Sequence, residues 1–133
     1  PKIEKITKSL KINLIKRPAK LAQDDTYKMD AIKHAVQEIM RDKIIPSIVV
    51  SVQANSPELK SETIDKSIDK LIKNKRSEIV TVDKNFSQNG ALRTMLLNTV
   101  FEKNLSTNLG VILSNETDIH TIEDLKKVNK KKN

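Results

Sequence analysis

The side chains best suited to chemistry in this sequence are amides and carboxylates that follow predicted strands. An apolar run at residues 48–52 ends at a polar corner, residues 53–56, which contains Gln53 and Asn55. A helical pattern begins at Ser61, so the three segments form a βα unit, and ligands of open α/β sheets bind at the carboxyl ends of the strands. The pattern alone favours an ordinary structural corner, because corners between strands and helices are polar in any case.

A second group of polar side chains follows the last predicted strand, residues 111–113. Asp118 and His120 lie just beyond it, and Thr121 and Asp124 have the spacing of a capping box that opens a final helix. This position is expected to direct the Asp118 carboxylate to the strand-end crevice. The alternative is a carboxylate that only favours the helix N-terminus through the helix dipole.

Apolar periodicity places the elements that must position these side chains. It predicts helices that begin near residues 3, 28, 61 and 121, a short helical turn that ends at residue 101, and strands at residues 12–15, 48–52, 79–82 and 111–113. The alternation of strands and helices indicates an α/β fold.

Four segments of the chain carry more specific patterns. They are R-P-A-K-L-A at residues 17–22, V-Q-A-N-S-P at 52–57, Q-N-G-A at 88–91 and D-I-H-T-I-E-D-L at 118–125. In this order they resemble motifs of the sugar-activating cytidylyltransferases, the family of the CMP-sialic acid (acylneuraminate) and CMP-Kdo synthetases. The resemblance spans nearly the whole chain.

The resemblance implies one domain at residues 1–125, followed by a basic tail at 126–133. The domain would be a Rossmann-like nucleotidyltransferase: a three-layer, open, mostly parallel sheet with helices on both faces. The family's N-terminal strand and basic glycine-containing triphosphate loop have no counterpart here, so we expect a fold incomplete at its N-terminus. The implied reaction joins CTP and a 2-keto sugar acid, a nonulosonic acid or Kdo, into a CMP-sugar and pyrophosphate. We expect this chain alone to be inactive.

The resemblance also implies roles for single residues. Asp118 matches the first aspartate of the family's Asp-Ile-Asp pair and would be catalytic as a ligand of Mg²⁺, which prefers hard oxygen ligands. His120 replaces the second aspartate and is a poorer magnesium ligand. Gln53 and Asn89 match residues that contact the sugar acid, since an amide both donates and accepts hydrogen bonds. Their alternative role is to satisfy backbone groups in turns.

Three further residues complete the expected substrate site. Asn55 stands where the Kdo branch has a metal-binding aspartate, Gln88 precedes Asn89, and Arg17 would contact a ligand phosphate or cap the turn before Pro18. Two departures favour an alternative, a non-catalytic α/β binding or assembly domain that retains the scaffold. Leu59 replaces a family arginine, and His120 replaces an aspartate.

Composition restricts the remaining possibilities. The net charge of +8 resides in residues 1–20, at +6, and 126–133, at +5, whereas residues 21–125 carry −3. With only three aromatic residues, this distribution argues against nucleic-acid binding. The chain has no cysteine, no apolar run of membrane-spanning length and no visible signal peptide, so we expect a cytoplasmic protein without a membrane partner. A homodimer stays open, although the family's dimerisation arm has no room between the strand ending at Val82 and Gln88.

Overall fold

The computed structural model describes residues 2–23 and 25–131 of this mixed α/β protein. The chain divides into two compact units, Pro1–Ile45 and Pro46–Asn133, which we describe one at a time. Within the described residues, no helix has the length and apolar character needed to cross a membrane. The single domain expected over residues 1–125 stays a prediction.

The first unit is helical. It contains α1 (Lys2–Ser9), the 3₁₀ helix η1 (Ala19–Leu21) and α2 (Lys28–Arg41), and the predicted helices near residues 3 and 28 are confirmed. The strand predicted at residues 12–15 is wrong, because this segment has no regular structure. Ile12 is 56% exposed and Leu14 40%, and a short apolar run forms a strand only where another strand pairs with it.

The second unit contains the sheet. Its elements are β1 (Ile48–Val52), α3 (Ser61–Lys73), β2 (Glu78–Val82), β3 (Gln88–Leu96), α4 (Leu97–Phe101), β4 (Leu109–Leu113) and α5 (Ile122–Lys131). The predicted strands at 48–52, 79–82 and 111–113 are confirmed, as are the helices from residues 61 and 121 and the turn ending at 101. Most of the predicted basic tail belongs to α5, and residues 132 and 133 lie outside the described part.

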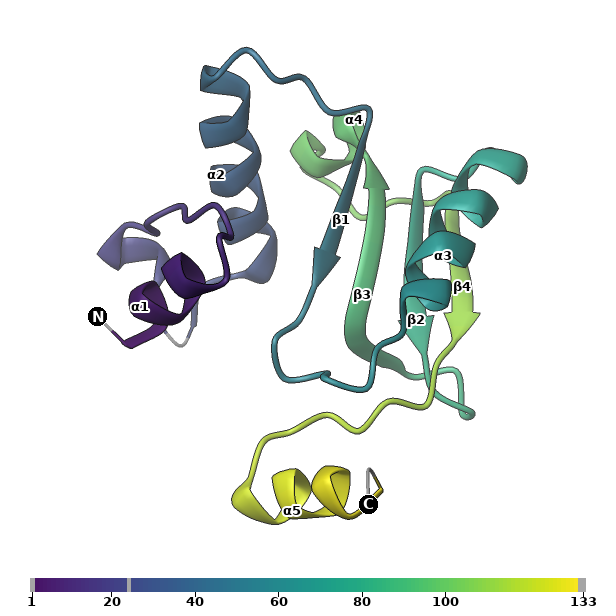
Figure 1. Ribbon diagram of the computed structural model, residues 1–133. Coiled ribbons are helices and arrows are strands. Elements are labelled where there is room, and N and C mark those ends of the chain that lie inside the picture. The colour runs from purple at the N-terminus through teal and green to yellow at the C-terminus, as the bar shows by residue number, and fades with distance from the viewer. Residues whose placement is uncertain (1, 24, 132–133) are drawn as a thin grey trace. The chain divides into compact units, whose positions relative to one another are not determined.

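The four strands form a mixed sheet in the order β1-β3-β2-β4. Strands β1, β2 and β4 point the same way and β3 points the opposite way (Figure 1). Because β3 lies between β1 and β2, only the β2–β4 pairing is parallel. Two of the three pairings are antiparallel, so the sheet is mixed and the expectation of a mostly parallel sheet is wrong.

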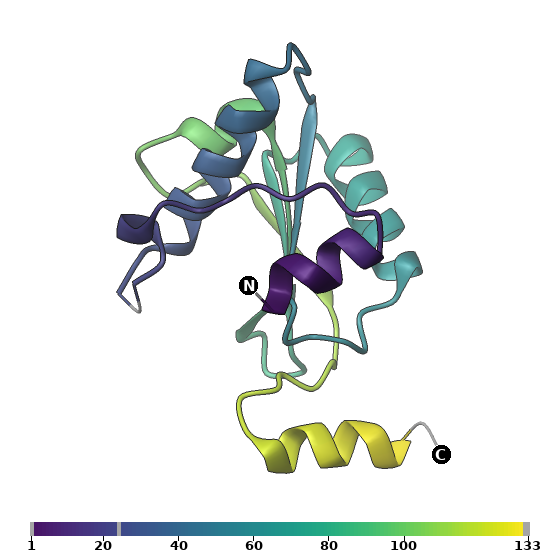
Figure 2. The ribbon, with the colours of Figure 1, turned by 60° about the vertical axis from the view of Figure 1, so that its left-hand side comes forward.

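Helices α3 and α4 lie on opposite sides of this sheet (Figure 2). The amphipathic pattern of α3 buries Leu71 against the sheet and leaves charged residues outside. Ser67 and Thr94 form a hydroxyl–hydroxyl hydrogen bond of 2.6 Å between α3 and β3, and both residues are fully buried. The core also contains Ile79 and Met95, which have no exposed surface.

The turn between β2 and β3 holds an exposed aromatic side chain in an unfavourable backbone conformation. The Asp83 carboxylate accepts hydrogen bonds from the amides of Asn85, at 2.8 Å, and Ser87, at 3.0 Å. This local network fixes Phe86 at a φ of 61°, where side chains other than glycine are disfavoured, although Phe86 is 69% exposed. A phenylalanine at this position therefore lowers the stability of the turn.

Replacing Phe86 with glycine should therefore stabilise the fold. Left-handed backbone costs about 1–2 kcal/mol for a residue with a Cβ, and glycine loses about 0.5–1 kcal/mol more entropy on folding. We expect Phe86→Gly to raise the free energy of unfolding in urea by about 0.5–1 kcal/mol. Phe86→Ala is the matched control, because it removes the ring and keeps the Cβ. Equal stability of the two variants would refute the strain.

Candidate functional site

The strand directions bring four chain segments to one edge of the sheet. Val82, at the carboxyl end of β2, pairs with Leu113 at the end of β4 and with Gln88 at the start of β3. At the same edge Val52 of β1 pairs with Leu92. The segments after β1 and β4 and the first residues of β3 therefore meet there, which brings three of the four motif segments together. Asp118, Gln53 and Asn89 belong to these three segments.

The segments that follow β1 and β4 are hydrogen-bonded to each other, although β1 and β4 are the two outermost strands of the sheet. Three strand spacings separate β1 from β4, about 14 Å. Across this gap the Ile119 amide donates to the Asn55 carbonyl at 2.9 Å, and the Thr117 amide donates to the Glu58 carboxylate at 2.9 Å. The two segments therefore pass over the ends of the middle strands and meet.

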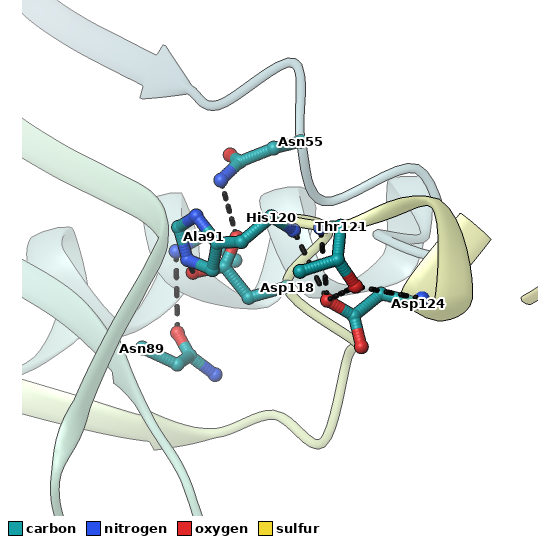
Figure 3. A network of polar contacts seen from close by, with 7 residues as sticks. All are labelled: Asn55, Asn89, Ala91, Asp118, His120, Thr121 and Asp124. Atoms are coloured by element: carbon teal, nitrogen blue, oxygen red, sulfur yellow. Dashed lines mark hydrogen bonds and ion pairs between the residues drawn. The ribbon is translucent and has the colours of Figure 1, made fainter. Parts of the chain in front are cut away.

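Asp118 lies at the centre of this junction (Figure 3). Its Oδ1 accepts a hydrogen bond from the Asn55 side-chain amide, and its Oδ2 lies 2.8 Å from Nε2 of His120. The Asp118 side chain is 34% exposed and that of His120 is 71% exposed. The carboxylate is thus held from both sides and still reaches solvent.

A magnesium ion at this junction would have few protein ligands. Among the residues that the structure describes, no three His, Asp or Glu side chains are grouped to hold a metal ion. Magnesium needs only one or two protein carboxylates, and each Asp118 oxygen keeps a lone pair beyond its present hydrogen bond. Nε2 of His120 is already directed to Asp118, so Asp118 is the residue that fits.

Asn89 is held by its neighbours in a structural arrangement. Its Oδ1 accepts from the Thr81 hydroxyl at 2.6 Å and from the Ala91 amide at 3.2 Å, and its Nδ2 donates to the Ser114 carbonyl at 2.7 Å. These contacts join β2, β3 and the segment after β4, and Thr81 is fully buried. One N–H of Asn89 remains for a ligand, so the structural role has the stronger support.

In Gln53, unlike Asn89, neighbouring residues hold the backbone and not the side chain. Its backbone is fixed, since its amide donates to the Ala91 carbonyl at 3.1 Å and its carbonyl accepts from the Ser56 amide at 3.2 Å. Its side chain is half-buried and has no hydrogen-bond partner within residues 2–23 and 25–131. Gln88 is exposed at the start of β3. Gln53 is therefore the amide most available to a ligand.

Arg17, the remaining candidate, belongs to the first unit. It is exposed in the irregular segment before η1. The sequence interpretation missed Glu58 and Thr81. Both act through partners distant along the chain, Thr117 and Asn89, and no local pattern marks such pairs.

The capping box predicted at the start of α5 is confirmed. The Thr121 hydroxyl accepts from the Asp124 amide at 3.2 Å, and the Asp124 carboxylate accepts from the Thr121 amide at 3.1 Å. The Thr121 hydroxyl, then the Lys127 ammonium and the His120 amide, lower the pKa of Asp124 from its usual 3.8 to about 2. The box fixes the helix that follows the Asp118 segment.

Sequence comparisons identify no relative: the chain matches no protein-family model and no curated protein. The resemblance to the cytidylyltransferases therefore rests on the four motifs.

The role of Asn89 can be tested by stability. Asn89→Ala removes three hydrogen bonds and leaves the buried Thr81 hydroxyl only the Leu92 carbonyl, 3.4 Å away, as an acceptor, so we expect the free energy of unfolding to fall by about 1–3 kcal/mol. Urea denaturation measures this change. The control is Gln88→Ala at the exposed neighbouring position, which should change stability by less than about 0.5 kcal/mol. If both variants unfold like the wild type, Asn89 does not join the strands.

The capping box makes a prediction about pH. A lowered pKa in the folded state means that the Asp124 carboxylate supports α5 fully above pH 3.8 and loses that effect as the pH falls through about 2. An NMR titration of the Asp124 carboxyl carbon should have its midpoint near 2, and Thr121→Ala should move it up toward 3.8. Glu123→Gln, one residue before Asp124, should leave it in place. A wild-type midpoint at 3.8 would contradict the box.

Proposed function

We propose that this chain is part of a cytidylyltransferase that activates a 2-keto sugar acid, a nonulosonic acid or Kdo, with CTP. The observation that carries the proposal is the meeting of three motif segments, at residues 52–57, 88–91 and 118–125, at one edge of the sheet. Their order along the chain is that of the family. Strand-end edges are also where open α/β sheets bind ligands.

The finer fold belongs to the same proposal. A four-stranded mixed sheet with α3 on one side and α4 on the other is compatible with a Rossmann-like nucleotidyltransferase of three layers. In the part of the chain that the structure describes, β1 is an edge strand. A further strand that pairs with its outer side would enlarge the sheet next to Gln53.

The chemistry asks the protein to align a sugar hydroxyl with the α-phosphate of CTP and to balance the charge on the phosphates. Gln53 would orient the sugar acid, because its amide is free and its backbone is fixed. Asp118 would hold magnesium, and when bound this ion neutralises phosphate charge. Asn55 and His120 would hold the Asp118 carboxylate in place through the contacts described above.

The second candidate is a non-catalytic α/β binding or assembly domain. Its support is that Asn89 and Asp118 already have protein partners for most of their hydrogen-bonding groups, as in a purely structural junction. Leu59 and His120, which replace charged residues of the family, point the same way. The turn at residues 83–87 holds no arm for a homodimer of the family's kind.

The test is pyrophosphate release by the full-length protein with CTP, magnesium and a panel of Kdo and nonulosonic acids. We expect turnover with one sugar acid, a lower kcat/KM by about 2–10-fold for Gln53→Ala from the loss of one hydrogen bond, and an unchanged melting temperature. Asp118→Asn should lose most activity and its magnesium dependence, whereas His120→Ala should be mild.

The matched amide control is Asn104→Ala, an exposed residue between α4 and β4 at the other end of the sheet. It should leave the kinetics unchanged. Absence of turnover with every sugar acid would favour the assembly domain. Turnover that is insensitive to both Gln53→Ala and Asp118→Asn would place the active site elsewhere.

A further inference from the structure

A second surface, distinct from the site around Gln53 and Asp118, lies along the outer side of β4. The Val111 carbonyl accepts a hydrogen bond from Nζ of Lys70 at 2.7 Å, so it points away from β2. The Ser114 amide, in contrast, donates to Val82 of β2 at 2.9 Å. Backbone groups alternate in direction along a strand. The amides and carbonyls of Leu109, Val111 and Leu113 therefore face outward.

An open groove of about 580 Å³ lies beside residues 111–113 of this strand. Helix α3 forms one wall, with Lys66, Lys70 and Lys73, while Phe86 and Leu113 contribute apolar surface. Phe86 is 69% exposed and Leu113 60% exposed. The groove thus combines outward backbone groups that pair with no strand among the described residues, a basic wall and exposed apolar side chains.

The charges of the groove are mostly positive, although residues 21–125 are net acidic. Lys73 forms an ion pair of 2.9 Å with Asp69, and Lys70 donates to Val111. Lys66 has no partner for its ammonium among the described residues. The spacing of the three lysines, at positions i, i+4 and i+7, places them on one face of α3. This row favours an anionic occupant.

We propose that this groove binds an extended acidic segment of a partner protein, which adds to β4 as a fifth strand. Its backbone would pair with the outward groups of Leu109, Val111 and Leu113. Side chains of a strand alternate between the two faces, so every second residue would be acidic and face the α3 lysines. The residues between would be apolar and lie beside the exposed Leu109 and Leu113.

Lys70 connects the free and the bound states. In the free protein its ammonium covers the Val111 carbonyl, and a lysine at an unpaired strand limits unwanted strand pairing. An acidic segment supplies a carboxylate for Lys70 and an amide for Val111 at the same time. A segment without acidic residues offers no such exchange, so the lysine selects for charge.

Two other occupants are less suited to the groove. A second copy that paired β4 with β4 would bring two rows of lysines together, and like charges oppose that contact. A nucleic acid is less suited because the Asp69 carboxylate in the groove repels phosphates, and Phe86 is a single aromatic side chain for base stacking among the lining residues. A nucleic acid also has no peptide backbone that could pair with β4.

The test uses a peptide with fluorescein on its N-terminus, fluoresceinyl-Glu-Val-Glu-Val-Glu-Val-Glu-amide, and the full-length protein. We expect binding by fluorescence anisotropy and NMR shifts at the amides of Leu109, Val111 and Leu113. The peptide with lysine in place of glutamate should not bind. Two further peptides carry N-methyl groups on alternate backbone amides, one peptide for each of the two alternating sets. At least one of these peptides should lose binding, because its methyl groups block the amides that pair with β4.

Protein variants separate this groove from general charge attraction. The double variant Lys66→Glu, Lys73→Glu should weaken binding by about tenfold or more, because both changes reverse the charge next to the peptide. Lys103→Glu, after α4 and outside the groove, should change it by less than about twofold. Phe86→Gly should weaken binding without destabilising the fold.

Three outcomes would overturn the proposal. Undiminished binding of both N-methylated peptides, or unshifted β4 amides, would show that no strand is added. An oligothymidylate that binds as tightly as the peptide, and that loses this binding in the double variant, would identify the groove as a general polyanion surface. A dimer in sedimentation, lost on mutation of Leu113 to lysine, would identify a second copy as the occupant.

Discussion

The antiparallel pairing of β3 with both β1 and β2 is the constraint on which the second unit depends. It fills the space between two strands that run in the same direction, so β1, β2 and β4 all end at one edge while β3 begins there. The segments that follow β1 and β4 then meet across about 14 Å of strand ends. The hydrogen bond between Asn55 and Asp118 and the contacts of Asn89 secure that arrangement. Candidate chemistry and structural support therefore share the same side chains.

Local signals in the sequence sufficed for much of this unit. A run of branched apolar residues predicts β1 and β2, and the amphipathic pattern from Ser61 predicts α3. Thr121 and Asp124 predict the start of α5, because a capping box is a contact between residues three apart. Each of these features depends on neighbours in sequence, which a single chain displays directly.

Features that depend on distant partners were not accessible in the same way. Residues 12–15 have the composition of a strand but lack regular structure, and the sequence does not show whether a partner strand exists. The roles of Asn89 and Glu58 depend on Thr81, Ser114 and Thr117, which other strands and loops supply. The sequence predicted Gln53 and Asn89 as equivalent amides. The structure distinguishes a free amide from one that is already bound.

The central claim is that the edge at Gln53 and Asp118 receives a sugar acid. The most direct measurement is an NMR titration of the full-length protein with Kdo and with N-acetylneuraminate, in the presence of CTP and EDTA, which removes magnesium and so prevents turnover during the titration. The account predicts that one of the two sugars shifts the side-chain amide of Gln53 and the backbone amides of residues 53–56 and 118–120, and shifts the Asn89 side-chain amide less. Saturable shifts confined to other surfaces, or none with either sugar, would contradict it.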